Sequence, residues 1–227
     1  MFKYESEMTK PVRDWLLAQG LMTKVEFKTP WGICDLVGVQ INKEKADLRV
    51  NYNQRSTIGP IPRIALLERI PDAESGKSMG MAHLARIFDW WLTSDKLESE
   101  INYLIRKKFL ISKRKDYYQK LNGWMPLHDR MVAVELKLNR VNEALYQAIS
   151  NTTIFTESYV GLPFDSAVRI AEGKRRFEFE KNNIGLLAVK SNFCEKLISP
   201  RVSNKDANSV LQIHAGESFW RLFLKEY

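Results

Sequence analysis

The spacing of hydrophobic residues changes from helical to extended along the first 41 residues. Apolar side chains recur every three or four positions over residues 6–19, which predicts a helix that Gly20 ends. Extended runs at 24–28 and 33–41 follow, and a Pro-Trp-Gly turn separates them. The second run is almost entirely apolar, which is typical of a central strand that is covered on both faces.

This pattern breaks at about residue 52, where prolines, glycines and a short apolar run replace it. Two amphipathic helices are predicted over 81–92 and 95–108, and an aromatic-rich hairpin with a charged turn is predicted over 109–124. Two helices followed by a basic hairpin are typical of a winged helix-turn-helix. We therefore expect residues 52–128 to form an inserted, mainly helical, winged-helix-like module.

Strand spacing returns at 131–138, and helical and extended patterns then alternate to the end of the chain. The elements predicted there are a helix at 140–150, a strand at 157–162, a helix at 165–173, a strand at 184–190 and an amphipathic helix from residue 208. Residues 1–51 and 129–227 together predict an α/β core in which helices flank a mixed sheet.

Composition narrows the class of protein mainly by exclusion. The chain has 227 residues, of which 44% are hydrophobic and 27% charged, so it is neither a disordered nor a collagen-like polypeptide. No apolar run approaches the roughly 18 residues that a membrane span requires, and two cysteines cannot build a disulfide framework. We expect a cytoplasmic protein with no membrane partner.

The net charge of +8 is concentrated in the middle of the chain. Residues 52–128 supply five of these charges, and residues 101–120 hold seven Lys and Arg against one Asp, with aromatic rings interleaved. Such cations bind phosphates, and the rings stack on bases. The residues expected to contact nucleic-acid phosphates are Arg106, Lys107, Lys108, Lys113, Arg114 and Lys115. A solvated basic helix face is the alternative interpretation.

Three ionisable residues, Asp35, Glu135 and Lys137, interrupt otherwise apolar strands. A charge buried without a partner is costly, so such groups are usually paired with one another, with a metal or with a substrate. Glu135 and Lys137 lie two positions apart, and therefore on the same face of a strand. Two carboxylates and a lysine suit metal-assisted hydrolysis of a phosphodiester. The alternative is a structural ion pair in a non-catalytic α/β domain.

Asp35 followed by Glu135-Leu136-Lys137 resembles the signature of the PD-(D/E)XK nuclease superfamily, which includes restriction endonuclease-like and Holliday junction resolvase-like proteins. The opening helix and the later YVGLP and IGLLAV runs are similar to other elements of that fold. The resemblance covers residues 1–51 and about 129–200, and it implies that residues 52–128 are an insertion.

The resemblance also implies a metal site. Asp35 and Glu135 would bind Mg²⁺ directly, with Mn²⁺ as a substitute, and the backbone carbonyl of Leu136 would contribute. The first helix of that family carries an acidic residue that faces the metal. Glu7 is the best match for this residue, and Glu5 is the second.

Two further roles follow from the same resemblance. Lys137 would position the attacking water and stabilise developing negative charge, and Gln147 on the next helix would support the lysine or a phosphate. The tripeptide Glu26-Phe27-Lys28 also has E-x-K spacing. Asp35 and the second E-x-K are preferred because a strand follows Asp35.

The sequence therefore predicts a Mg²⁺-dependent endodeoxyribonuclease of PD-(D/E)XK type, whose basic insert binds the nucleic acid. RNA remains an alternative to DNA as the substrate. A homodimer is also expected, because each chain would have one active site and a duplex has two strands to cut. Two other functions stay open. One is a catalytically inactive nuclease-fold protein with a DNA-binding or regulatory role. The other is a nuclease subunit whose insert docks it into a defence or repair complex.

Overall fold

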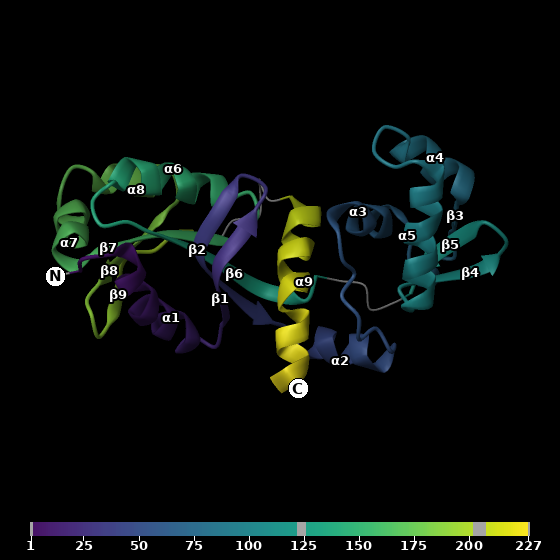
Figure 1. Cartoon of the computed structure of the whole chain (residues 1–227), viewed down its shortest axis with the longest axis horizontal. Coiled ribbons are helices and arrows are strands. Elements are labelled where there is room, and N and C mark those ends of the chain that lie inside the picture. The colour runs from purple at the N-terminus through teal and green to yellow at the C-terminus, as the bar shows by residue number, and fades with distance from the viewer. Residues whose placement is uncertain (1, 122–125, 202–207, 227) are drawn as a thin grey trace. The chain divides into compact units, whose positions relative to one another are not determined.

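Two compact units make up the computed structural model of the protein (Figure 1). The residues that the structure describes are 2–121, 126–201 and 208–226. The first unit consists of Met1–Ile41 and His128–Asn208, and the second consists of Asn42–Leu127 and Ser209–Tyr227. The chain thus leaves the first unit once and returns to it.

A mixed six-stranded sheet forms the centre of the first unit. Its strands are β1 (Met22–Thr29), β2 (Gly32–Ile41), β6 (His128–Leu136), β7 (Glu157–Pro163), β8 (Gly185–Val189) and β9 (Cys194–Ile198). They lie in the order β1-β2-β6-β7-β8-β9. Strands β6, β7 and β8 are parallel, whereas β1, β2 and β9 run antiparallel to their neighbours. The predicted mixed α/β architecture is confirmed.

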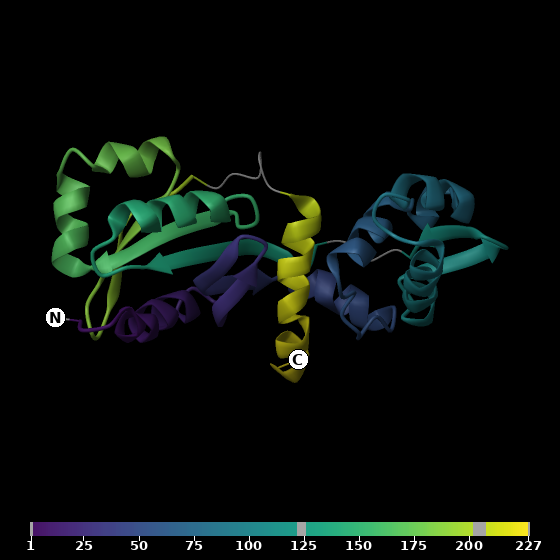
Figure 2. The same ribbon diagram turned by 45° about the horizontal axis from the view of Figure 1, so that its top comes forward.

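Helices cover both faces of this sheet (Figures 1 and 2). They are η1 (Glu5–Met8), α1 (Thr9–Leu17), α6 (Val141–Asn151), α7 (Phe164–Glu172) and α8 (Arg176–Lys181). On one face α1 shares a core with Val134 and Leu136 of β6. On the other face α6 and α7 share a core with Val160 of β7. Because side chains alternate along a strand, Glu135 of β6 faces the α6 side.

The first helix and the first strand show how local sequence shapes the sheet. Gly20 has a φ of +75°, which glycine adopts without strain, and Leu21 N–H then donates to the Leu16 carbonyl at 3.3 Å to close α1. In β1, Glu26 has a φ of +53° and no ladder partner, while its neighbours pair with β2. The first E-x-K tripeptide therefore begins at a conformational irregularity in an edge strand, with the register of the pairing unchanged on either side.

The second unit combines helices with a small antiparallel sheet. Its elements are α2 (Lys43–Asn51), α3 (Ile61–Arg69), η2 (Ala73–Ser75), β3 (Met79–Gly80), α4 (Met81–Phe88), α5 (Ser94–Arg106), β4 (Leu110–Arg114), β5 (Tyr117–Lys120) and α9 (Ser209–Glu226). The strand order is β3-β5-β4. The predicted hairpin is β4–β5, and residues 122–125 at its far end lie outside the described residues.

The boundaries of the units differ from the expected ones at two places. Helix α2, which Asn42 caps, and helix α9 both belong to the second unit. The reason is a buried ion pair between Arg49 and Glu217, in which the guanidinium also lies over the ring of Trp220 at 4.3 Å. Contacts between residues so distant in sequence leave no periodic signal.

The insertion leaves and re-enters the sheet at neighbouring strands. Strands β2 and β6 pair directly, with Leu36 opposite Val134 and Ile41 opposite His128. This pairing brings the segments around Asp35 and Glu135 together, although the whole insertion separates them in the sequence.

The elements that the hydrophobic pattern did not predict are short or polar. They are α2, α3, α8, β3 and β9. Strand β9, for example, exposes Glu195 and Lys196 and fully buries only Ile198 at the sheet edge. Within the described ranges, every helix is too short or too polar to cross a membrane.

Candidate active site

Asp35 and Glu135 meet where the β2–β6 ladder stops. Leu36 and Val134 are the last pair there, so Asp35 and Glu135 are the next residues on the two strands. The Asp35 carboxylate accepts a hydrogen bond from the backbone N–H of Leu136 at 2.7 Å, and so continues the pairing. Asp35 is half-buried and Glu135 is only 3% exposed. Both side chains face α6.

Lys137 directly follows β6. It comes two residues after Glu135 and therefore lies on the same face of the strand. Its backbone N–H donates to the Gly161 carbonyl at 3.1 Å, which keeps the segment extended beside β7. Its Nζ lies 3.9 Å from a carboxylate oxygen of Glu5 and 3.9 Å from one of Glu143. The buried ammonium is therefore compensated by two carboxylates of the first unit.

Helix α6 presents a polar stripe to this site. Glu143, Gln147 and Asn151 are spaced four residues apart, and thus lie on one face of the helix. Asn151 Nδ2 donates to Oε1 of Glu135 at 2.7 Å, while Glu143 approaches Lys137. Gln147 lies between them, and its Oε1 is buried with no hydrogen-bond partner among the described residues.

The surroundings of Glu135 favour its protonated form. Burial raises the pKa of Glu135 to about 7, the hydrogen bond from Asn151 opposes the rise, and the charge of Asp35 adds to it. Burial also raises the pKa of Asp35, and the hydrogen bond from Leu136 N–H opposes this. Oε2 of Glu135 is buried and has no hydrogen-bond partner in the part of the chain that the structure describes. This oxygen can accept a proton or a cation.

Glu5, and not Glu7, reaches Lys137. A carboxylate oxygen of Glu5 also accepts from the backbone N–H of Leu138 at 3.3 Å. The Glu7 carboxylate accepts from the backbone N–H of Lys3 at 2.6 Å, at the start of η1. The metal-binding role expected of Glu7 stays a prediction. Glu5 is the acidic residue of the first turn that lies beside Lys137.

The site offers oxygen ligands to a hard cation. Within residues 2–121, 126–201 and 208–226, no three His, Cys, Asp or Glu side chains are grouped closely enough to hold a metal ion. Mg²⁺, however, usually binds through one or two carboxylates and completes its coordination with water and substrate phosphate. Asp35, Glu135 with its unpaired Oε2, and the Leu136 carbonyl fit that requirement, and they are the groups that would hold Mg²⁺ or Mn²⁺.

The six basic residues expected to bind nucleic acid lie in two neighbouring segments of the second unit. Arg106, Lys107 and Lys108 end α5, and Lys113, Arg114 and Lys115 form the tip of the β4–β5 hairpin. All are exposed except Lys107, which is half-buried. The Arg114 guanidinium lies 4.5 Å from the ring centre of Tyr117, so a cation and an aromatic ring are presented together at the tip.

Asn151, like Glu143, is a residue of the site that sequence reasoning missed. It is 2% exposed, and Trp31 Nε1 donates to its Oδ1 at 3.4 Å, which orients its amide toward Glu135. One signal was available, because Asn151 lies four residues after Gln147 and continues the polar stripe of the helix. Its contact with Glu135 depends on how α6 packs on β6, which no local pattern shows.

Comparisons with known proteins identify no relative. No family model, no curated protein and no solved structure matches this chain. What the site can do therefore follows from its own chemistry: two carboxylates, a lysine and an amide converge on the face of the sheet that α6 covers.

Proposed function

We infer that this protein is a metal-dependent endonuclease that hydrolyses phosphodiester bonds in DNA. The observation that carries the proposal is the convergence of Asp35, Glu135 and Lys137 at adjacent strand ends. One buried oxygen of Glu135 has no hydrogen bond to any residue that the structure describes. Two carboxylates and a lysine so placed match the needs of phosphodiester hydrolysis. The order α1, β1, β2, β6, α6, β7 is also the one that the hydrophobic pattern predicts for the segments outside the insert.

The carboxylates and the lysine would have different roles in the reaction. Bound Mg²⁺ supplies positive charge for the phosphate and lowers the pKa of water. Asp35 and Glu135 would hold it, and Asn151 keeps Glu135 in the orientation that leaves Oε2 available. Lys137 would orient the attacking water and stabilise negative charge on the phosphate, while Glu5 and Glu143 hold its ammonium in place.

The second unit would supply affinity for the nucleic acid. In chain order α3, β3, α4, α5, β4 and β5 follow one another, and the β4–β5 hairpin occupies the position of a wing. Its exposed cations would contact phosphates. This division makes physical sense, because the catalytic groups recognise only a phosphodiester.

A second candidate function is a nuclease-like protein that binds DNA without cutting it. Lys137 already has two carboxylate partners, and no three acidic, His or Cys side chains of the described residues form a metal cluster. In such a protein the trio would serve as a structural ion-pair network. It would bind DNA through the same cations of the second unit.

The experiment that separates the two is cleavage of supercoiled and linear DNA with Mg²⁺ or Mn²⁺. Wild type is compared with Lys137→Ala and Asp35→Asn. The matched control is Glu26→Gln with Lys28→Ala, which removes the other E-x-K tripeptide from the edge strand. We expect metal-dependent nicking that falls at least about 100-fold in the first two variants and is unchanged in the control.

Two results would contradict this proposal. Tight DNA binding without cleavage of linear, supercoiled or branched DNA, or of RNA, would favour the non-cutting protein. Cleavage that survives Lys137→Ala and Asp35→Asn would place the active site elsewhere.

A further inference from the structure

Two adjoining cavities lie where the parallel strands of the first unit end. The larger, of about 770 Å³, includes Leu138 after β6, Pro163 at the end of β7 and Lys190 after β8. The smaller, of about 360 Å³, lies between the segment after β6 and the helices α7 and α8. Both volumes are in the range of roughly 300–1,000 Å³ that ligand pockets occupy.

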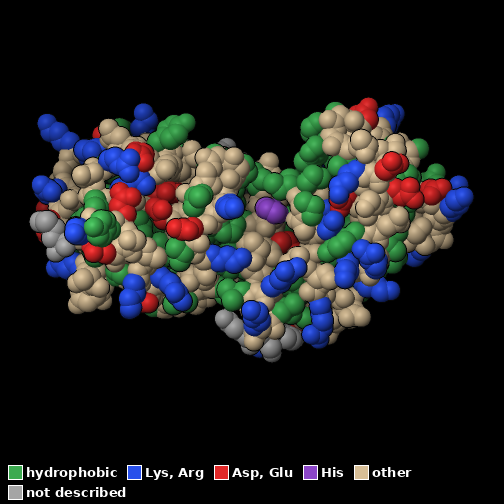
Figure 3. Space-filling model, viewed as in Figure 1, with side chains coloured by type: hydrophobic (Ala, Val, Ile, Leu, Met, Phe, Trp, Pro, Cys, Tyr) green, Lys and Arg blue, Asp and Glu red, His purple; other side chains and the backbone are tan. Residues whose placement is uncertain are grey.

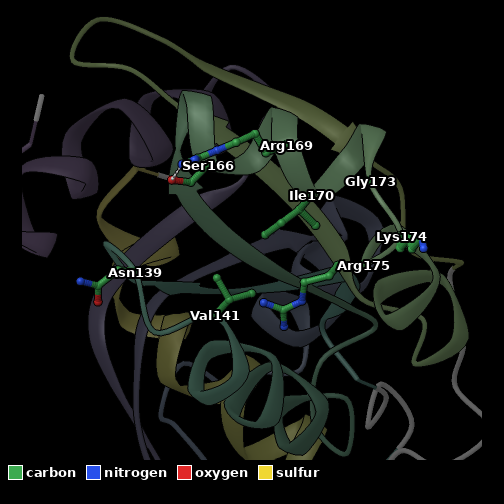
Figure 4. Close-up of a pocket in the computed structure, with 8 residues that line it drawn as sticks. All are labelled: Asn139, Val141, Ser166, Arg169, Ile170, Gly173, Lys174 and Arg175. Carbon is green, nitrogen blue, oxygen red and sulfur yellow. Dashed lines mark hydrogen bonds between the residues drawn. The ribbon is translucent and has the colours of Figure 1, made fainter.

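The smaller cavity is lined by three cations and by no acidic residue (Figure 4). Arg169 comes from α7, and Lys174 and Arg175 precede α8. In Figure 4 the guanidinium of Arg175 reaches inward toward Val141, whereas Lys174 lies at the rim and points away. A concave site with this charge is suited to an anion.

The two arginines are held in place without losing their capacity to donate. Arg169 donates to the Ser166 hydroxyl at 3.3 Å and to the Asp165 carbonyl at 3.2 Å, and it forms no ion pair with any described residue. Arg175 donates to Glu178 through Nε at 3.3 Å and Nη2 at 3.0 Å, and through Nη2 also to Asn142 Oδ1, which leaves Nη1 without a hydrogen bond to the described residues. A guanidinium matches the geometry of phosphate oxygens. Figure 4 draws the two guanidiniums apart, that of Arg169 beside Ser166 and that of Arg175 beside Val141.

The two cavities share lining residues, and the larger one includes the residue that follows Lys137. Asn139, Ser166 and Arg169 line both cavities. Leu138, in the larger one, directly follows Lys137. A strand that enters the active site can therefore continue along the carboxyl ends of β6, β7 and β8.

We propose that Arg169 and Arg175 each bind a phosphate group of a nucleic-acid strand that passes beside the scissile phosphate. The larger cavity has room for the attached sugar and base. This inference rests on the proposed function for its substrate. Over the first unit, at the left of Figure 3, Lys and Arg side chains are mixed with Asp and Glu and form no continuous basic patch on the face drawn. A phosphate would thus be recognised here by a local pocket.

The test measures binding, without turnover, to the full chain in EDTA. The probes are thymidine tetranucleotides labelled at the 3′ end, one with a 5′-phosphate and one with a 5′-hydroxyl, and the readout is fluorescence anisotropy. The variants are Arg169→Ala and Arg175→Ala, and the matched control is Arg176→Ala. Arg176 is an exposed neighbour on α8 that pairs with Glu180 and lines neither cavity.

We expect Arg169→Ala and Arg175→Ala each to weaken binding at least fivefold, with an unchanged melting temperature, and Arg176→Ala to bind like wild type. A loss with both probes supports the site and assigns it to an internal phosphodiester. A loss with only the 5′-phosphorylated probe supports it and assigns it to a terminal phosphate. Equal binding by wild type and both variants, or an equal loss in Arg176→Ala, would overturn it.

These outcomes are separate from those of the cleavage experiment. If the protein cuts no nucleic acid but loses affinity in the two arginine variants, the phosphate site stands and the nuclease proposal fails. If it cuts and the arginine variants bind normally, only the phosphate site fails.

Discussion

At the scale of single residues, the least favourable group in the first unit is the Glu135 carboxyl. It is almost fully buried, Asn151 satisfies one of its oxygens, and the other has no hydrogen-bond partner among the described residues. Burying such a group lowers the stability of the folded state unless a ligand compensates its charge. The proposed Mg²⁺ site would use this oxygen, and the burial of Glu135 leads to two predictions.

Glu135→Gln should stabilise the metal-free protein at high pH. The pKa of Glu135 is raised to about 7, so the folded state holds a proton that the unfolded state releases near pH 4.5, and wild type loses stability as the pH rises between these values. Glutamine removes that loss. The gain relative to wild type should be about 3 kcal/mol larger at pH 8 than at pH 4, measured by urea unfolding in EDTA.

Two observations control this prediction. Glu172→Gln, at an exposed position of α7, should show a much smaller difference because water solvates its charge. Added Mg²⁺ should stabilise wild type and not Glu135→Gln. A gain in Glu135→Gln that does not change with pH would contradict the burial argument.

Asn151 should act as a positioning residue for Glu135. Because its hydrogen bond opposes the rise in the pKa of Glu135, Asn151→Ala should move the acidic limb of the pH–rate profile for DNA cleavage to higher pH. The rate at neutral pH should fall about 10- to 100-fold. The neighbouring Ser150→Ala, which removes only a hydrogen bond to its own helix, is the control. A lower rate with an unshifted profile would indicate a structural effect alone.

At the scale of elements, the β4–β5 hairpin is the clearest carrier of nucleic-acid affinity. Lys113, Arg114 and Lys115 are all exposed at its tip, next to Tyr117. By contrast, the exposed face of α5 mixes charges, with Asp95 and Glu98 toward its start. The hairpin is thus better suited to phosphates than the preceding helix is.

Replacing the three hairpin cations by Glu should weaken DNA binding at least about tenfold. The dependence of log K on log salt should also become shallower, with a slope smaller in magnitude by about 1 to 3. Titrations at several salt concentrations measure both quantities. The control changes Arg176, Lys181 and Lys225 to Glu, which alters the net charge equally at exposed positions elsewhere. Equal losses in the two triple variants would mean that total charge, and not the hairpin, determines affinity.

At the scale of the whole molecule, the second unit is assembled from two separate stretches of chain. Glu217 of α9 pairs with Arg49 of α2, and it also accepts from the backbone N–H of Ile58 at 2.9 Å. Removing one member of a buried pair leaves the other charge uncompensated. The C-terminal helix therefore stabilises the inserted unit.

Glu217→Ala should destabilise the second unit by about 3 to 5 kcal/mol. Hydrogen exchange should show faster exchange of the amides of residues 42–121, while those of the six-stranded sheet keep their protection. Glu217→Gln, which retains an acceptor for Ile58 N–H, should lose less. Uniform loss of protection in both units would show that they unfold together.

Much of the fold could be predicted from sequence, because it depends on local periodicity. The apolar run of β2, the stripe of α6 and the strands β7 and β8 have patterns that burial on one or both faces imposes. Asp35, Glu135 and Lys137 stood out for the same reason, as charges in apolar strands. The short α8 and the polar edge strand β9 carry no such pattern and were not predicted.

The sequence by itself determined the helices and strands that have a clear hydrophobic periodicity, and it marked Asp35, Glu135 and Lys137 as charges within apolar strands. Only the tertiary structure decided that Glu5 lies beside Lys137, that Asn151 holds Glu135, and that α9 belongs to the inserted unit. The physical reason is that periodicity records how each residue is buried, whereas contacts between distant residues depend on strand register and on how helices pack, and these arise only when the chain folds.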